Sequence, residues 1–172
     1  RTRARRLSTH AHVLTFAISA ALSVLLWLTI DPILRAIGAS GKALELATVY
    51  LTILLPTLPM LATGMTSMAV LRSAGDARRS MHVTLFGAAI NFVLDLLFIV
   101  YFGWGITGAA AASFIARIGV MAVGLYGVIG VHKLMTRPKL ATLRLDSRTF
   151  LAVGLPAVLT NVATPASNAY VT

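Results

Sequence analysis

The chain has 172 residues, of which 58% are hydrophobic and only 12% are charged, and its formal net charge is +10. Soluble proteins carry about 25% charged residues, so this composition indicates a membrane protein, and the length of its charge-poor runs makes it an all-α polytopic one. Cysteine is absent, which excludes disulfides and thiolate metal sites. The first residue is Arg rather than Met, and we expect the chain to be a piece of a longer protein.

Five charge-poor runs follow one another, at residues 12–37, 46–71, 81–102, 107–131 and 150–172. Each run reaches the roughly 20 residues that a membrane-spanning helix needs. The second run contains Pro56 and Pro59, which remove backbone donors and predict a helix kink. The sequence leaves two interpretations of this kink equally open, a packed bend without function and a moving gate.

The connections between these runs alternate in basic content. Basic residues concentrate before the first run, between the second and third runs, and between the fourth and fifth runs: Arg1, Arg3, Arg5 and Arg6; Arg72, Arg78 and Arg79; Lys133, Arg137, Lys139, Arg144 and Arg148. Lys and Arg in short connections mark the cytoplasmic side. We therefore expect an inner-membrane protein with this N-terminus inside, whose charge serves orientation rather than nucleic-acid binding.

Polar residues interrupt the third and fourth runs. A turn near residues 103–106 would make the two helices antiparallel, so positions equally far from it lie at equal depth. At 1.5 Å per residue, Asp95 and Ser113 would both lie about 9 Å below the outer boundary, and Asn91 and Arg117 about 15 Å below it. Asn91 and Asp95 share one helix face, as do Ser113 and Arg117, so two polar stripes are predicted to meet.

A charged side chain at such depth costs at least about 2.5 to 3.5 kcal/mol, so it normally faces the bundle interior and finds a partner. One interpretation is structural: Asp95 and Arg117 form a buried salt bridge that fixes helix register. The other is functional: Asp95, Asn91 and Ser113 bind Na⁺ or exchange a proton. We favour the functional interpretation. The sequence offers no other metal site.

Three motifs carry a family resemblance. "LRSAGD" at residues 71–76, "NFVLD" at 91–95 and "GITGAAAAS" at 105–113 follow one another in this order. The ordered set resembles the central part of multidrug and toxin extrusion (MATE) transporters, and the flanking segments are similar to that family as well. The resemblance covers essentially the whole chain.

The resemblance implies a helical bundle that is part of a twelve-helix, two-bundle transporter, with the five runs as its third to seventh helices. Residues 1–133 would hold four helices of the N-terminal bundle. Residues 134–149 would form a basic cytoplasmic linker between the bundles, and residues 150–172 the first helix of the C-terminal bundle. The remaining helices of the parent transporter would be the partners of this fragment.

The implied activity is antiport: Na⁺ or H⁺ enters in exchange for drugs, organic cations or other small amphipathic compounds, by alternating access and without another cofactor. The family's cation site would fall on Asp95, Asn91 and Ser113, with Ser in place of the frequent Thr. Arg117 is the candidate charge partner of Asp95. Neutralisation of Asp95 by Arg117 would weaken Na⁺ binding and favour proton coupling.

Other functions remain as alternatives. A lipid-linked saccharide flippase of the same superfamily would be expected to carry more cationic residues in its cavity than the lone Arg117. A non-transporting scaffold subunit would use the polar stripes only for packing. An enzyme is least supported, because no nucleophile, base and orienting group come together.

Some polar residues have ordinary structural interpretations. We expect Asp76 to cap the helix that follows it and Asp31 to pair with Arg35 at a spacing of four residues. The histidines are spaced unlike metal ligands and are expected at the membrane interface: His10, His12, His82 and His132.

Overall fold

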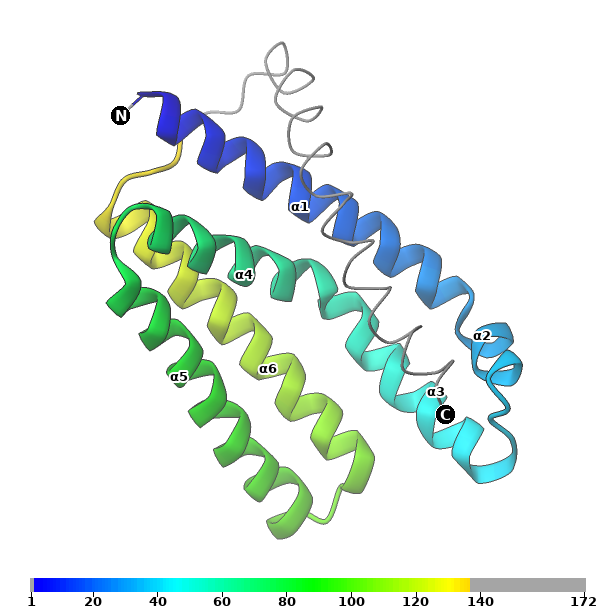
Figure 1. The fold of residues 1–172 in the computed structure, drawn as a ribbon. Helices are drawn as coiled ribbons and strands as arrows, with labels where there is room; N and C mark the ends of the chain where they lie inside the picture. Colours follow the sequence, from blue (N-terminus) through cyan, green and yellow to red (C-terminus); the bar gives the residue numbers. More distant parts are fainter. Residues whose placement is uncertain (1, 137–172) are drawn as a thin grey trace, which may run out of the picture.

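The computed structural model describes residues 2–136, and these form helices connected by short turns, without a strand (Figure 1). The elements are α1 (Thr2–Leu28), α2 (Ile30–Ala36), α3 (Gly41–Leu54), η1 (Leu55–Thr57), α4 (Leu58–Ser73), α5 (Ala77–Asp95), η2 (Leu96–Tyr101), α6 (Gly105–Leu125) and η3 (Tyr126–Val131). The all-α membrane fold predicted from composition and from the length of the charge-poor runs is confirmed. Most of the predicted 134–149 linker, and the whole predicted helix at 150–172, lie outside the described residues.

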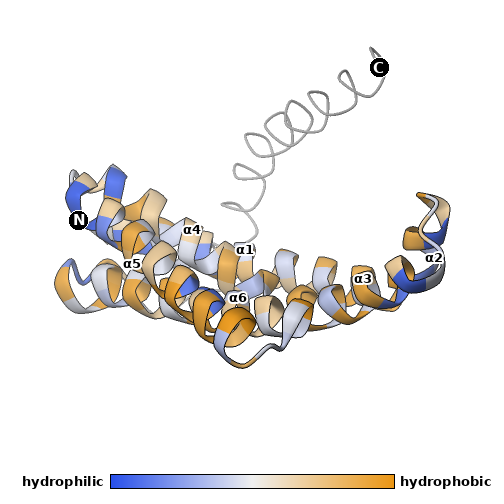
Figure 2. Ribbon diagram, turned by 90° about the horizontal axis from the view of Figure 1, so that it is seen from below, coloured by the Kyte–Doolittle hydropathy of each residue, from blue (hydrophilic) through white to orange (hydrophobic). Residues whose placement is uncertain are grey.

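Four of these helical stretches are long and apolar enough to cross a membrane: Arg3–Leu28, Gly41–Ser73, Ala77–Tyr101 and Gly105–Val131. Large apolar side chains such as Leu28 and Phe92 are 68% and 66% exposed, which is costly in water but favourable in lipid. Figure 2 shows apolar residues along the middle of the helices and hydrophilic ones towards the N-terminus and α2. The described part is therefore shaped for a bilayer.

The first span begins earlier than the predicted residue 12 and is interrupted at Thr29. It starts earlier because hydropathy detects only the apolar part of a helix, while arginine is itself a good helix former. It is interrupted because Pro32 lacks the amide hydrogen that would bond the carbonyl of Leu28. At the break, the Thr29 amide donates to the carbonyl of Leu26 (3.1 Å) and its hydroxyl to that of Leu25 (2.8 Å).

The spans run alternately up and down, so their ends fall into two groups (Figure 1). The N-terminus, the α4–α5 turn and the end of η3 lie at one end of the molecule, which we call the N-terminal end. The α2–α3 connection and the turn between η2 and α6 lie at the other. Among the described residues, the basic segments before the first run and between α4 and α5 therefore share one end, as their alternation predicted.

Small residues allow α6 to approach its neighbours closely. Ala110 and Ala112 of α6 are fully buried. Further along, Val120 lies against Gly64 of α4 and against Gly87 of α5. A β-carbon at Gly64 would stand only 2.7 Å from Val120 Cγ1. In lipid such close contacts provide much of the packing energy between helices, so α6 is the central element of the described bundle.

A compact apolar core lies near the N-terminal end. Leu71 of α4, Val83 of α5 and Val128 of η3 are at most 2% exposed and form one cluster. Met68, Val123 and other half-buried side chains pack around it. This core holds three spans together below the α4–α5 turn.

Candidate functional site

The two polar stripes meet, but one turn away from the predicted register. The Asn91 side-chain amide donates to the hydroxyl of Ser113 at 3.5 Å, so Asn91 rather than Asp95 lies opposite Ser113. Two features explain the difference. Residues Leu96–Tyr101 form a π-helix, whose wider turns rise less per residue, and α6 begins at Gly105, which places Ser113 deeper.

Asp95 is the last residue of α5, directly before this π-helix, and it is half-buried. Within residues 2–136 its carboxylate has no hydrogen bond and no ion pair. A π-turn inside a helix is often found at functional sites, because it turns a side chain or carbonyl out of the regular pattern. Asp95 is thus a carboxylate inside an apolar span that the described bundle does not neutralise.

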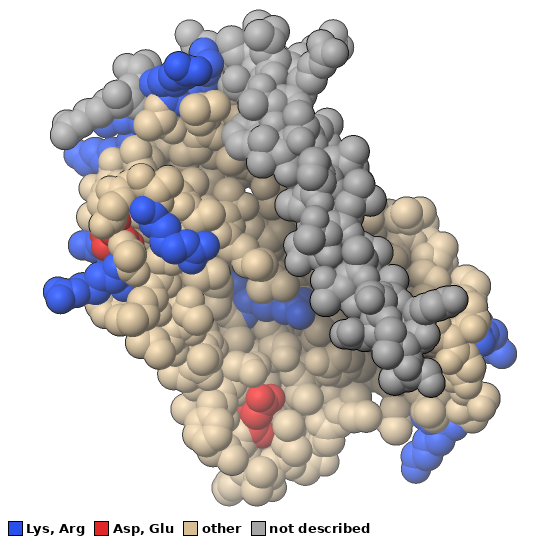
Figure 3. Space-filling view, viewed as in Figure 1, with Lys and Arg blue, Asp and Glu red and all other residues tan. Residues whose placement is uncertain are grey.

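Arg117 does not pair with Asp95. Its Nη1 donates to the hydroxyl of Thr57 (2.5 Å) and to the carbonyl of Leu54 (3.2 Å). Arg117 lies in the middle of the described span Gly105–Val131, and Figure 3 shows that few charged residues lie away from the ends of the spans. The salt-bridge interpretation of Asp95 and Arg117 is therefore wrong for this arrangement of the chain, and Arg117 belongs instead to the break between α3 and α4.

That break contains the predicted kink residues. Pro56 lies within the short 3₁₀ helix η1, and Pro59 is the second residue of α4. The carbonyl of Leu55 accepts from the amide of Leu58 and from the hydroxyl of Ser23 in α1 (2.6 Å). Since Pro59 cannot supply the usual i→i−4 donor, these two groups replace it. The carbonyl that the break leaves without its helical donor is therefore hydrogen-bonded, as burial in a membrane requires. The role of the break as a gate stays a prediction.

The two sides of the break are linked to different spans. Ser23 from α1 binds it at Leu55, and Arg117 from α6 binds it at Leu54 and Thr57. Thr57 is fully buried and itself donates to the Leu54 carbonyl at 2.6 Å. Sequence reasoning identified Arg117 and the prolines separately. It missed their contact, because a carbonyl exposed by a 3₁₀ turn has no residue-type signature.

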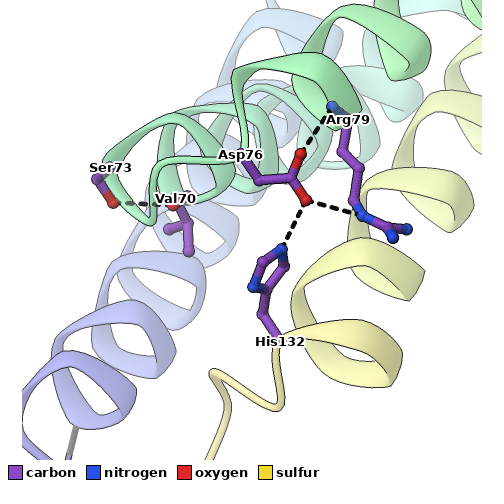
Figure 4. A network of polar contacts seen from close by, with 5 residues as sticks. All are labelled: Val70, Ser73, Asp76, Arg79 and His132. Atoms are coloured by element: carbon purple, nitrogen blue, oxygen red, sulfur yellow. Dashed lines mark hydrogen bonds and ion pairs between the residues drawn. The ribbon is translucent and has the colours of Figure 1, made fainter.

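Asp76 caps α5 as predicted and also joins two spans at the N-terminal end (Figure 4). Its Oδ1 accepts from the Arg79 amide (3.0 Å), and its Oδ2 lies 2.8 Å from Arg79 Nε and 2.7 Å from His132 Nε2. The hydrogen bond from His132, followed by that from the Arg79 amide, lowers the pKa of the Asp76 carboxyl below its usual value. The "LRSAGD" motif thus binds the residue that directly follows η3.

The predicted Asp31–Arg35 pair is present at the other end of the molecule, with Arg35 Nε 2.7 Å from Asp31 Oδ2. Both side chains are more than half exposed, so the pair adds little stability. Its bond to Asp31 raises the pKa of Arg35 further above its already high value.

Two histidines that were expected at the interface are buried instead. His10 and His12 are 0% and 4% exposed. His12 Nε2 lies 2.9 Å from the hydroxyl of Ser67 on α4, and His12 Nδ1 lies 2.8 Å from the carbonyl of Ser8. His12 therefore links α1 to α4. Among the described residues no group of His, Asp or Glu is arranged to bind a metal ion.

Comparison with known proteins identifies the family. A profile of the MatE family matches residues 1–97. A curated relative from Shewanella oneidensis, named FAD transporter, is 30% identical over 169 residues, which cover 94% of this chain and 37% of the relative.

Solved structures agree with this assignment. An inward-facing multidrug resistance MATE family transporter of the MOP superfamily is 26% identical, with a TM-score of 0.75 over 88% of this chain and 35% of its own. A MOP superfamily transporter from Pyrococcus furiosus, described as having a binding pocket of reverse polarity, is 27% identical, with a TM-score of 0.82 over 92% of this chain and 36% of its own.

The chain thus spans between a third and two fifths of the length of these relatives. Its fold, its motifs and its relatives lead to one conclusion. The chain belongs to the MatE family, whose members are membrane transporters rather than enzymes.

Proposed function

We propose that the full-length protein couples the inward movement of Na⁺ or H⁺ to the export of an organic compound, with Asp95 as the coupling carboxylate. The observation that carries this proposal is the state of Asp95: it lies inside an apolar span and has no ion pair within residues 2–136. A buried carboxylate is costly unless it binds a cation or a proton. Transport coupling supplies such a ligand.

The environment of Asp95 supports this role. Arg117, the candidate charge partner of Asp95, is bound to Thr57 and Leu54, so it leaves the Asp95 carboxylate available to a cation. Asn91 and Ser113 add a carbonyl and a hydroxyl oxygen one helical turn away. Hard cations prefer oxygen ligands of these kinds.

Alternating access needs an element that can change shape, and the α3–α4 break is our candidate. It contains two prolines and holds hydrogen bonds to α1 and to α6 at once. A change in the charge state of Asp95 on α5 would reach the break through α6, which packs against both α5 and α4. We propose that exchange of these bonds accompanies the transition between inward-facing and outward-facing states.

The coupling test uses the full-length parent in proteoliposomes. Asp95→Asn keeps size and hydrogen bonding but removes the titratable charge, and we expect it to abolish ion-driven transport. Glu45→Gln, which removes a carboxylate near the start of α3, is the matched control and should transport normally. Separate Na⁺ and pH gradients identify the coupling ion. Full ion-driven transport by Asp95→Asn would exclude this function for Asp95.

Two substrate classes have support. Drugs and organic cations follow from the family, whereas the Shewanella relative is named an FAD transporter. FAD carries a diphosphate, and Arg117 offers a cation in the middle of a span. We therefore propose FAD or a similar organic anion as the second candidate.

Counterflow of FAD and of ethidium, measured side by side, separates the two classes. Uptake of FAD alone would support the anion. Uptake of ethidium alone would support export of organic cations.

A further inference from the structure

A pocket of about 580 Å³ lies between the first turns of α1 and the last turn of α4. Arg3, Arg6 and Ser8 supply polar groups to its wall, and Leu7, Val70 and Leu134 supply apolar ones. The pocket lies at the N-terminal end of the molecule. It shares no lining residue with the polar stripes at Asp95 and Arg117, so it is a separate site.

The polar groups of this pocket are of the kind that binds an anion. A guanidinium presents several N–H donors in a planar fork that matches the oxygens of a phosphate group. Arg3 is exposed at the pocket, and Arg6 is half-buried. Ser8 is only 5% exposed, and its hydroxyl has no hydrogen-bond partner within residues 2–136. A buried hydroxyl without a partner costs free energy, which a phosphate oxygen would recover.

The remaining wall and the position of the pocket suggest a lipid rather than a soluble anion. Leu7, Val70 and Leu134 form an apolar surface beside the arginines, as suits a ligand with a charged head and an apolar tail. The pocket also lies where the spans begin, together with the basic residues that gather at this end (Figure 3). Basic pockets between spans on the cytoplasmic side bind anionic headgroups.

We propose that this pocket binds the phosphate headgroup of an anionic phospholipid, with Arg3, Arg6 and Ser8 as donors and the leucine and valine side chains against the first part of the acyl chain. The ligand would link the start of α1 to the end of α4, the same two helices that His12 and Ser67 join deeper in the membrane. The bound lipid would therefore stabilise the packing of α1 on the bundle.

The test uses the full-length protein and two variants that remove the same charge. Arg3 lines the pocket, whereas Arg5, two residues away and also exposed, does not. Binding of phosphatidylglycerol is measured by titration into purified protein in neutral detergent, with phosphatidylcholine as the uncharged control. Arg3→Gln should weaken phosphatidylglycerol binding about fivefold, the usual effect of one basic residue at a membrane surface, and Arg5→Gln should change it little.

A second variant tests the pocket without changing charge. Ala4 lines the pocket, and Ala4→Leu should fill part of it and lower phosphatidylglycerol binding while transport by the protein in lipid vesicles continues.

Inorganic phosphate at millimolar concentration distinguishes a lipid headgroup from a free anion as the ligand. If it displaces the lipid completely, the site recognises a free anion.

The proposal is also overturned by equal losses in Arg3→Gln and Arg5→Gln, by equal binding of phosphatidylcholine, or by binding unchanged in Ala4→Leu. Equal losses would indicate unspecific attraction by the basic end of the protein. Absence of any bound lipid in the full-length protein would show that another part of the chain occupies the pocket.

Discussion

At the scale of single residues, Arg117 is held by a carbonyl and a hydroxyl instead of a carboxylate. Hydrogen bonds to a charged group contribute about 1.5 to 3 kcal/mol each, which offsets much of the cost of placing a cation in a span. Because these acceptors are neutral, the charge of Arg117 is not cancelled. The same residue can therefore hold the α3–α4 break and still attract an anion.

A double-mutant cycle tests the contact between Arg117 and Thr57. Arg117→Gln and Thr57→Val should each lower the melting temperature of the full-length protein in detergent, and the double variant should lose less than the sum. We expect a coupling of about 0.5 to 3 kcal/mol, the range for residues in direct contact. Arg117→Lys keeps the charge but not the planar fork, so it should recover only part of the loss. Additive losses would contradict the contact.

The Asp76 cluster predicts a pH dependence of stability. The pKa of Asp76 lies below its ordinary value of 3.8 in the folded protein, so its contribution is complete above pH 3.8 and is lost as the pH falls through the lowered value. Since the bond from His132 is the largest cause of the lowered pKa, His132→Ala should move the acid unfolding transition to higher pH by more than Arg79→Ala does. Unfolding followed by intrinsic fluorescence between pH 2 and 5, about the usual range for carboxyl groups, measures this. The opposite order would contradict the assignment.

At the scale of elements, α6 is placed by the size of the residues it meets. Val120 fits because Gly64 and Gly87, on two different helices, have no side chains at that depth. Valine is stiff at its first side-chain torsion, so it cannot easily turn away from an added methyl group. The positions of α4 and α5 around α6 therefore depend on two missing β-carbons.

Gly87→Ala should destabilise the bundle by about 1 to 3 kcal/mol, the usual cost of overpacking. Gly119→Ala is the matched control, since its β-carbon would meet Ile90 and Phe86 at ordinary distances of 3.4 and 3.5 Å. Thermal unfolding of the full-length protein in detergent compares the two. Similar melting temperatures for both variants would show that Val120 does not fix the helix spacing.

At the scale of the whole molecule, the basic connection between α4 and α5 and the turn before α6 lie at opposite ends of the spans. Position 79 lies after the α4–α5 turn at the N-terminal end, and Trp104 lies in the turn at the opposite end. Basic connections mark the cytoplasmic side, so we predict that position 79 lies inside and position 104 outside.

Labelling tests this orientation. These 172 residues contain no cysteine, so Arg79→Cys and Trp104→Cys each introduce a unique thiol into this part of the full-length protein. An impermeant maleimide added to sealed cells should label position 104 and not position 79. Labelling of position 79 alone would reverse the topology.

Much of this architecture was readable from the sequence, because lipid burial imposes a strong constraint on composition and length. The four described spans, the antiparallel polar stripes and the cap at Asp76 all follow from local patterns. The register at Ser113 did not, because a π-helix is a local change in winding that no residue type specifies. The partners of Arg117, and the burial of His12 against Ser67, depend on packing between distant segments, which local patterns do not record.

The tight turn before Gly105 has a consequence for biogenesis. Helices joined so closely can leave the translocon as a pair, so Asn91 can meet Ser113 before either faces lipid alone. Arg117 follows on the same helix, and its acceptors, Leu54 and Thr57, belong to a span that is synthesised earlier. The chain thus supplies the partners of its most costly residue before that residue arrives, and we expect synthesis order itself to lower the barrier to its insertion.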